Sequence, residues 1–138
     1  MTNSREVTDL RQPQQRLSAS TRAGSAVAVV LAAPGLAWLV LIARSGDAAS
    51  DTQHVLWFLV VGAACFTAGT LVPMRLGVVA ALSATAWVAA VLTLYLWWSS
   101  VDITGLFMVG IVLAAPPMAL AAPVLILAGA NLRRLTAS

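Results

Sequence analysis

The amino-acid sequence predicts an all-α protein, a four-helix transmembrane bundle with short loops. Four runs contain no Asp, Glu, Lys, Arg or His, and we expect the spans there, at about 23–43, 55–74, 76–98 and 106–130. Because the hydrocarbon core of a bilayer is about 30 Å thick, about 20 helical residues cross it. The composition agrees: 60% of the residues are hydrophobic and 9% are charged, against roughly 25% charged in soluble domains.

The first span follows a polar segment. Residues 1–22 are rich in Gln, Ser, Thr and Arg, so they cannot bury enough surface to offset the entropy lost on ordering. We therefore expect a disordered cytoplasmic tail there; the alternative is a short helix that docks on a partner. The run of 21 residues after it is longer than the roughly 7–15 of a signal peptide, which favours an uncleaved first span. The four spans form one domain over 23–132, and 133–138 is a second cytoplasmic tail.

The second span has a recognisable start and a tight end. Residues 50–53 read S-D-T-Q, the pattern of a capping box in which Ser50 and Gln53 bond reciprocally. Asp51 then lies near the positive end of the helix dipole, so the helix should begin near residue 51. Little more than residues 73–75 separates the second span from the third, and from so short a connection we expect the two helices to be antiparallel neighbours.

The fourth span is interrupted by Pro116, Pro117 and Pro123. Each proline lacks an N–H and clashes with the carbonyl four residues earlier, which predicts a kink. Pro34 predicts a second kink in the first span, because the string V-L-A-A-P occurs both at 30–34 and at 112–116. The alternative is a broken helix whose free carbonyls line a substrate or ion path.

The carbonyls freed by these prolines need donors, because an unpaired carbonyl is costly in lipid. In the fourth span these are the carbonyls of Val112, Leu113 and Ala119. The span has no Ser or Thr between Gly105 and Ala130. The donors we expect are hydroxyls of the second and third spans, namely Thr67, Thr70, Ser83, Thr85 and Thr93.

The arginines predict the orientation. With four spans, seven of the eight basic residues share one side, and Arg44 alone lies on the other. Positively charged loops stay inside, so both termini should be cytoplasmic. All basic residues are arginine, and Ala, Val and Gly are abundant; this is typical of GC-rich coding and favours a bacterial source. The expected location is the cytoplasmic (inner) membrane of a bacterium.

The positions of aromatic and small residues predict contacts with a partner or with lipid, and contacts between the helices. Four rings near the external interface are candidates for partner or lipid contact: Trp57, Tyr95, Trp97 and Trp98. Trp87 lies mid-span, so its indole N–H should find an acceptor within the protein. Small residues at helical spacing let membrane helices approach closely, and we expect them to hold the bundle together: Ala64 with Ala68, Cys65 with Gly69, Ala81 with Thr85 and Ala89, and Ala86 with Ala90.

Groups for catalysis are missing from the sequence. The spans contain no ionisable residue of the kind that marks proton relays or ion coupling, and the chain has no Ser-His-Asp set, H-E-x-x-H motif or phosphate loop. Asp47, Asp51, His54 and Asp102 could in principle bind a divalent cation, but Gly46 and the capping box place Asp47 outside the helix. We expect no enzymatic activity, no cofactor, no metal and no nucleic-acid partner.

These observations favour one function over another. The leading hypothesis is an accessory or structural subunit of a larger bacterial membrane complex, which binds membrane lipids and either another membrane protein or a second copy of itself. The alternative is a small oligomeric transporter or channel for an apolar or neutral solute. Lipid binding or membrane sensing is a third class.

Overall fold

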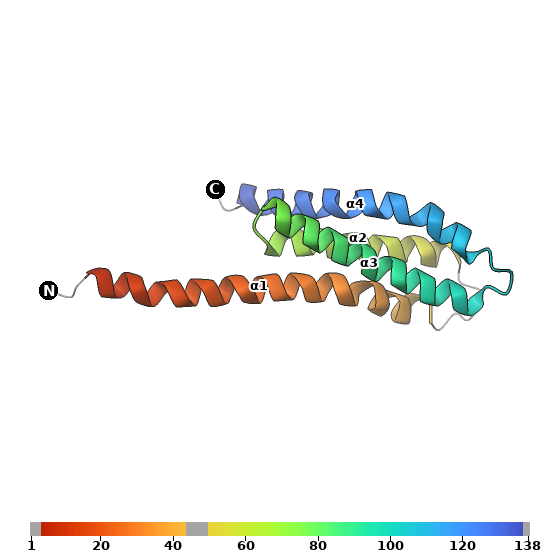
Figure 1. Ribbon diagram of the computed structural model, residues 1–138, viewed down its shortest axis with the longest axis horizontal. Helices are drawn as coiled ribbons and strands as arrows, with labels where there is room; N and C mark the ends of the chain where they lie inside the picture. The colour runs from red at the N-terminus through yellow and green to blue at the C-terminus, as the bar shows by residue number, and fades with distance from the viewer. Residues whose placement is uncertain (1–3, 44–49, 137–138) are drawn as a thin grey trace.

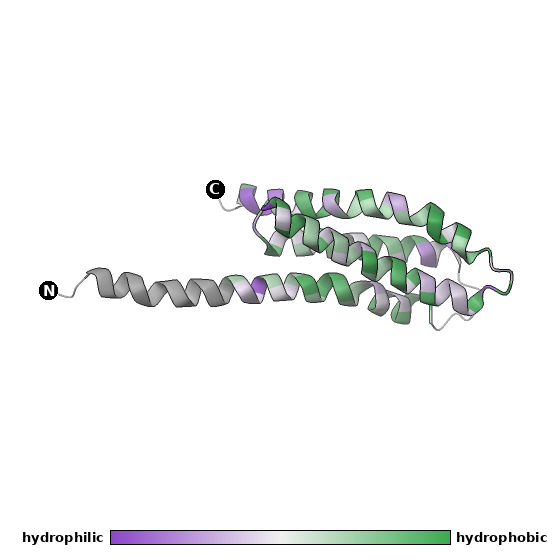
Figure 2. Cartoon of the chain, in the orientation of Figure 1, coloured by the Kyte–Doolittle hydropathy of each residue, from purple (hydrophilic) through white to green (hydrophobic). Residues whose placement is uncertain are grey.

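The computed structural model describes the backbone of residues 4–43 and 50–136, and the side chains from residue 19 onward within these ranges. It contains four helices, α1 (Ser4–Leu41), α2 (Asp51–Leu71), α3 (Leu76–Val101) and α4 (Phe107–Thr136), and no strand within the described ranges. Each has a stretch long and apolar enough to cross a membrane, and their middle sections are apolar (Figure 2). The predicted all-α fold is confirmed, and the chain is a small multi-pass integral membrane protein.

Helix α1 is longer than its span. The apolar part covers Ala19–Leu41, whereas the helix begins at Ser4 and extends past the bundle (Figure 1). The sequence predicts disorder before residue 23, but the backbone described there is helical. Arg, Gln, Glu and Leu are good helix formers, and an existing span supplies the nucleus that an isolated helix lacks. Helix α4 likewise continues through the expected C-terminal tail as far as Thr136.

The bundle has two chemically different ends. The α2–α3 connection, the C-terminal end of α4 and the N-terminal extension of α1 lie at the same end (Figure 1). We call it the basic end, because Arg22, Arg75, Arg133 and Arg134 belong to these segments. Asp51 and Asp102, at the start of α2 and the end of α3, mark the opposite end, which we call the distal end.

The helices are not paired as the short α2–α3 connection suggests. Helices α1 and α4 each pack against both α2 and α3, while α2 and α3 are diagonal and barely touch. The prediction that α2 and α3 are neighbours is therefore wrong. The backbone is extended at both ends of the connection 72–75, with ψ of 154° at Val72 and 129° at Arg75, and four residues can reach at most about 13 Å. That length spans the diagonal of a bundle whose helices are about 8–10 Å apart.

Small residues bring the helices together, most closely where α2 crosses α4. A Cβ added to Gly69 would overlap the carbonyl oxygen of Ile126, and one added to Gly129 would overlap that of Phe66. Ala68, Gly69, Ala86 and Ala90 are buried, as the small-residue pattern predicts. Ala64 and Ala89 are half-buried and Ala81 is exposed, so only part of that pattern faces the interior.

Polar side chains organise the distal end. Helix α2 begins at Asp51, and both hydrogen bonds of the capping box are present: the Gln53 amide donates to Ser50 Oγ, and the Ser50 amide donates to Gln53 Oε1. Gln53 Nε2 also donates to the carbonyl of Leu41, 2.7 Å away, at the end of α1. The predicted cap is confirmed, and it also ties the end of α1 to the start of α2.

Candidate functional site

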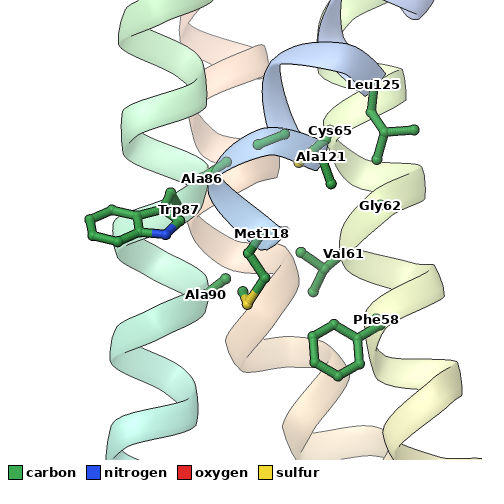
Figure 3. A pocket seen from close by; sticks show the side chains of 11 residues that line it. Phe58, Val61, Gly62, Cys65, Ala86, Trp87, Ala90, Met118, Ala121 and Leu125 are labelled. Atoms are coloured by element: carbon green, nitrogen blue, oxygen red, sulfur yellow. The ribbon is translucent and has the colours of Figure 1, made fainter. Parts of the chain in front are cut away.

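An apolar cavity of about 170 Å³ lies midway along the bundle, between α2, α3 and α4. It exists because α2 and α3 are diagonal and present small residues to each other. Gly62 and Cys65 of α2 face Ala86 and Ala90 of α3 across it (Figure 3). Helix α4 covers the gap but does not fill it.

The cavity is partly occupied by one flexible side chain. Met118 of α4 lies in the middle of it, between Ala90 on one side and Val61 and Phe58 on the other (Figure 3). Methionine adapts to irregular space, so this side chain could move aside for a ligand. Cys65 carries the one titratable group in the lining. The cavity is partly open at the surface of the bundle and can hold a small apolar group; an enclosed apolar cavity of similar volume, about 150 Å³, binds benzene.

Trp87 joins the cavity wall to the proline segment of α4. Its indole Nε1 donates to the carbonyl oxygen of Ala115 at 2.8 Å. This confirms that the mid-span Trp87 finds its acceptor inside the protein. Ala115 directly precedes the Pro116–Pro117 pair, and a carbonyl oxygen can accept two hydrogen bonds. The indole thus holds α3 against α4 where the helix is weakest.

The hydroxyls expected to satisfy the freed carbonyls of α4 do not reach them. Thr67, Thr70, Thr85 and Thr93 each donate to a carbonyl of their own helix, three or four residues earlier. The buried Ser83 hydroxyl has no hydrogen-bond partner among the described residues. That prediction is therefore wrong, because a threonine in a helix reaches its own preceding turn more easily than a neighbouring helix.

Helix α4 continues as a single helix through Pro116, Pro117 and Pro123. Val112 and Leu113, whose carbonyls lose their usual donors to the first two prolines, are 64% and 72% exposed. Both prolines of the pair are exposed as well. The weakened stretch of α4 thus lies on the outward surface of the bundle. Pro34, by contrast, is fully buried within α1.

The aromatic residues proposed for partner contact separate into two groups. Trp57 is 0% exposed and donates its indole N–H to the Pro34 carbonyl at 2.9 Å. Trp97 is 5% exposed and stacks on His54, with ring centroids 4.8 Å apart. These two rings belong to the core, which corrects their assignment to the surface. Trp98 is half-buried, and Tyr95 is 43% exposed and packs edge-on against Phe107.

The ionisable residues of the distal end form local hydrogen bonds in and beside the loops. The Asp102 carboxylate accepts from the hydroxyl and amide of Thr104 and from the amide of Phe107, at the start of α4. These hydrogen bonds, above all that from the Thr104 hydroxyl, hold the pKa of Asp102 below its usual value. His54 Nδ1 is 3.0 Å from the Ser50 carbonyl. Asp47 lies outside the described residues, and no cluster of three metal-binding side chains occurs within them.

Sequence reasoning missed the cavity. Its only signal was the set of small residues in the second and third spans, which could equally have been tight helix contacts. Comparison with protein-family models, with curated proteins and with solved structures finds no match. The fold and the site thus define a class: a four-span membrane protein with an apolar cavity midway along the bundle and an exposed helix that contains three prolines.

Proposed function

We propose that this chain is an accessory or structural subunit of a larger assembly in the cytoplasmic membrane of a bacterium, with both termini in the cytoplasm. The observation that carries the proposal is the outward face of α4. There, the carbonyls of Val112 and Leu113 have lost their backbone donors, and no threonine of α2 or α3 replaces them.

The cost of such carbonyls depends on what covers them. Facing lipid, each unsatisfied carbonyl is unfavourable, because hydrocarbon offers no donor. A partner helix with a Ser, Thr, Asn or Gln side chain supplies the donor and packs against the exposed proline segment of α4. Helix α4 is also the least covered span: 11% of its most apolar stretch is buried, against 22% to 28% in the other three. It is therefore the helix with most surface left for a partner.

Site-directed photocrosslinking in membranes tests this proposal. A photoreactive residue at Leu113 should capture a second, defined membrane protein. The matched control is Leu39 of α1, which is also apolar, within its span and 53% exposed. We expect no defined product from the control. A product at Leu113 that contains only this chain would point to self-association, and the absence of any protein product there would overturn the subunit proposal.

The prolines provide a second test. Replacing both Pro116 and Pro117 with alanine restores two N–H groups and removes the need for an outside donor. The crosslinking yield at Leu113 should then fall several-fold, while the protein remains folded. An unchanged yield would show that the freed carbonyls do not recruit the partner.

The cavity favours a second candidate, an oligomeric carrier or channel for an apolar or neutral solute. Xenon binding to the purified protein, followed by NMR, tests whether the cavity accepts such a solute. Ala90→Leu should fill the cavity and abolish binding, while the control Ala80→Leu, on the exposed face of α3, should leave it intact. A protein that binds no xenon would remove this candidate.

A further inference from the structure

A second hollow, of about 400 Å³, lies at the basic end between the α2–α3 connection and the last turns of α4. Its walls have two kinds of chemistry. Four lining residues, Val72, Pro73, Met74 and Ala130, are apolar, and the other three, Arg75, Arg133 and Arg134, each carry a guanidinium group. We call this hollow the arginine cleft.

Among the side chains that the structure describes, no carboxylate lies near the arginine cleft to neutralise its charge. The two acidic side chains described, Asp51 and Asp102, are at the distal end of the bundle. Helix α3 also begins at Leu76, directly after Arg75, and no side chain caps it. Its N-terminus adds partial positive charge to that of the arginines. The three guanidinium groups thus create a concentrated positive potential.

The position of two arginines along α4 places them where a spanning helix is expected to leave the hydrocarbon. Arg133 and Arg134 occupy the last turn of α4 and directly follow residues 107–132, which carry no charge and are long enough to cross the bilayer. Arg133 Nη1 lies 3.5 Å from the carbonyl of Leu71, at the end of α2, and is half-buried. This contact directs one guanidinium across the cleft from α4 towards α2. The stem of Arg133 is therefore less free than that of an ordinary surface arginine.

From this geometry we propose that the arginine cleft binds the phosphate of an anionic phospholipid. Guanidinium groups pair with phosphate oxygens through two parallel hydrogen bonds, and basic pockets between helix ends bind anionic headgroups. Pro73 and Met74, which also line the cleft, are exposed, and they argue for a lipid over free phosphate because they offer an apolar surface to the glycerol and the upper acyl chain. The proposal does not depend on the subunit function, since it rests on different residues, at the basic end of the bundle.

Native mass spectrometry of the full chain, released from detergent with added lipid, tests the proposal. Phosphatidylglycerol should remain bound where phosphatidylcholine does not. Because an arginine near an anionic surface contributes about fivefold in affinity, Arg133→Gln and Arg134→Gln should each weaken phosphatidylglycerol binding about fivefold. Arg133→Lys should lose less than Arg133→Gln, because it keeps the charge but not the planar fork.

Arg22→Gln is the matched control. Arg22 is an exposed arginine of α1 at the same basic end, and it does not line the cleft. It should bind phosphatidylglycerol as the unsubstituted protein does. Equal losses for Arg22→Gln and Arg134→Gln would mean a diffuse surface attraction and would overturn the site.

The source of the phosphate is tested separately. Millimolar inorganic phosphate should not displace the lipid, and full displacement would overturn the lipid assignment. Circular dichroism and size exclusion establish that each variant is folded. If Arg133→Gln fails that check, Arg134→Gln still decides the question, because the exposed Arg134 side chain is not needed for packing.

Discussion

The crossing of α2 and α4 makes a sharp prediction, because two glycines meet there. An added Cβ at Gly69 would lie 2.9 Å from the carbonyl carbon of Ile126 and closer still to its oxygen, whereas ordinary contact begins at 3.4 Å. The obstacle is backbone, which cannot rotate aside as a side chain does. The carbonyl carbon alone would require a separation of about 0.5 Å, and the nearer oxygen requires more, so Gly69→Ala must push the two helices apart by more than about 0.5 Å.

The expected loss of stability follows from that separation. Overpacking a well-packed interior costs about 1–3 kcal/mol, and the neighbouring side chains also lose dispersion contacts. We expect Gly69→Ala and Gly129→Ala each to lower the free energy of unfolding by about 1–3 kcal/mol. Because the separation of α2 and α4 that accommodates one added methyl group also makes room for the other, the double variant should lose less stability than the two single losses together.

Unfolding in mixed micelles by sodium dodecyl sulfate, followed by tryptophan fluorescence, measures these changes. Gly24→Ala is the control: Gly24 lies within α1, and an added Cβ there meets nothing within 4 Å. Alanine is favoured over glycine in a helix by about 0.5–1 kcal/mol, so the control should be neutral or slightly stabilised. If Gly69→Ala behaves like Gly24→Ala, the close crossing of α2 and α4 is not present in the folded protein.

Three further predictions concern the indoles, the distal loop and the orientation. Trp87→Phe removes the hydrogen bond to α4, whereas the buried N–H of the control residue Trp38 has no partner among the described residues. Trp87→Phe should therefore lower the free energy of unfolding by about 0.5–1.5 kcal/mol more than Trp38→Phe. Equal losses would contradict the hydrogen bond from Trp87. Asp102 has a lowered pKa in the folded state, so its stabilisation is complete above its usual value of about 3.9 and is lost as the pH falls through the folded-state pKa. Thermal unfolding of Asp102→Asn should lack that loss, and a pH profile equal to that of the unsubstituted protein would count against the hydrogen bonds from Thr104 and Phe107 to Asp102. In intact cells an impermeant thiol reagent should label Ser50→Cys but not Thr136→Cys, and labelling of both from outside would refute four crossings with an internal C-terminus.

The aromatic residues show where sequence reasoning stops. Trp57 and Tyr95 both lie near the ends of spans, so their positions alone predict interfacial rings. In the structure Trp57 is fully buried and bonded to Pro34, while Tyr95 remains at the surface. Depth in the membrane follows from position along a helix, whereas burial depends on which side of the helix a residue occupies.

The sequence alone determined the number of spans, the start of α2 and its cap, because these depend on local features: the length of apolar chain against bilayer thickness, and side chains three residues apart. The tertiary structure decided the diagonal placement of α2 and α3, the cavity beside Met118 and the arginine cleft. The spans are apolar on every side, so no amphipathic pattern marks the face that turns inward. In such helices small differences in side-chain size select the neighbours, and these differences act only when the helices meet.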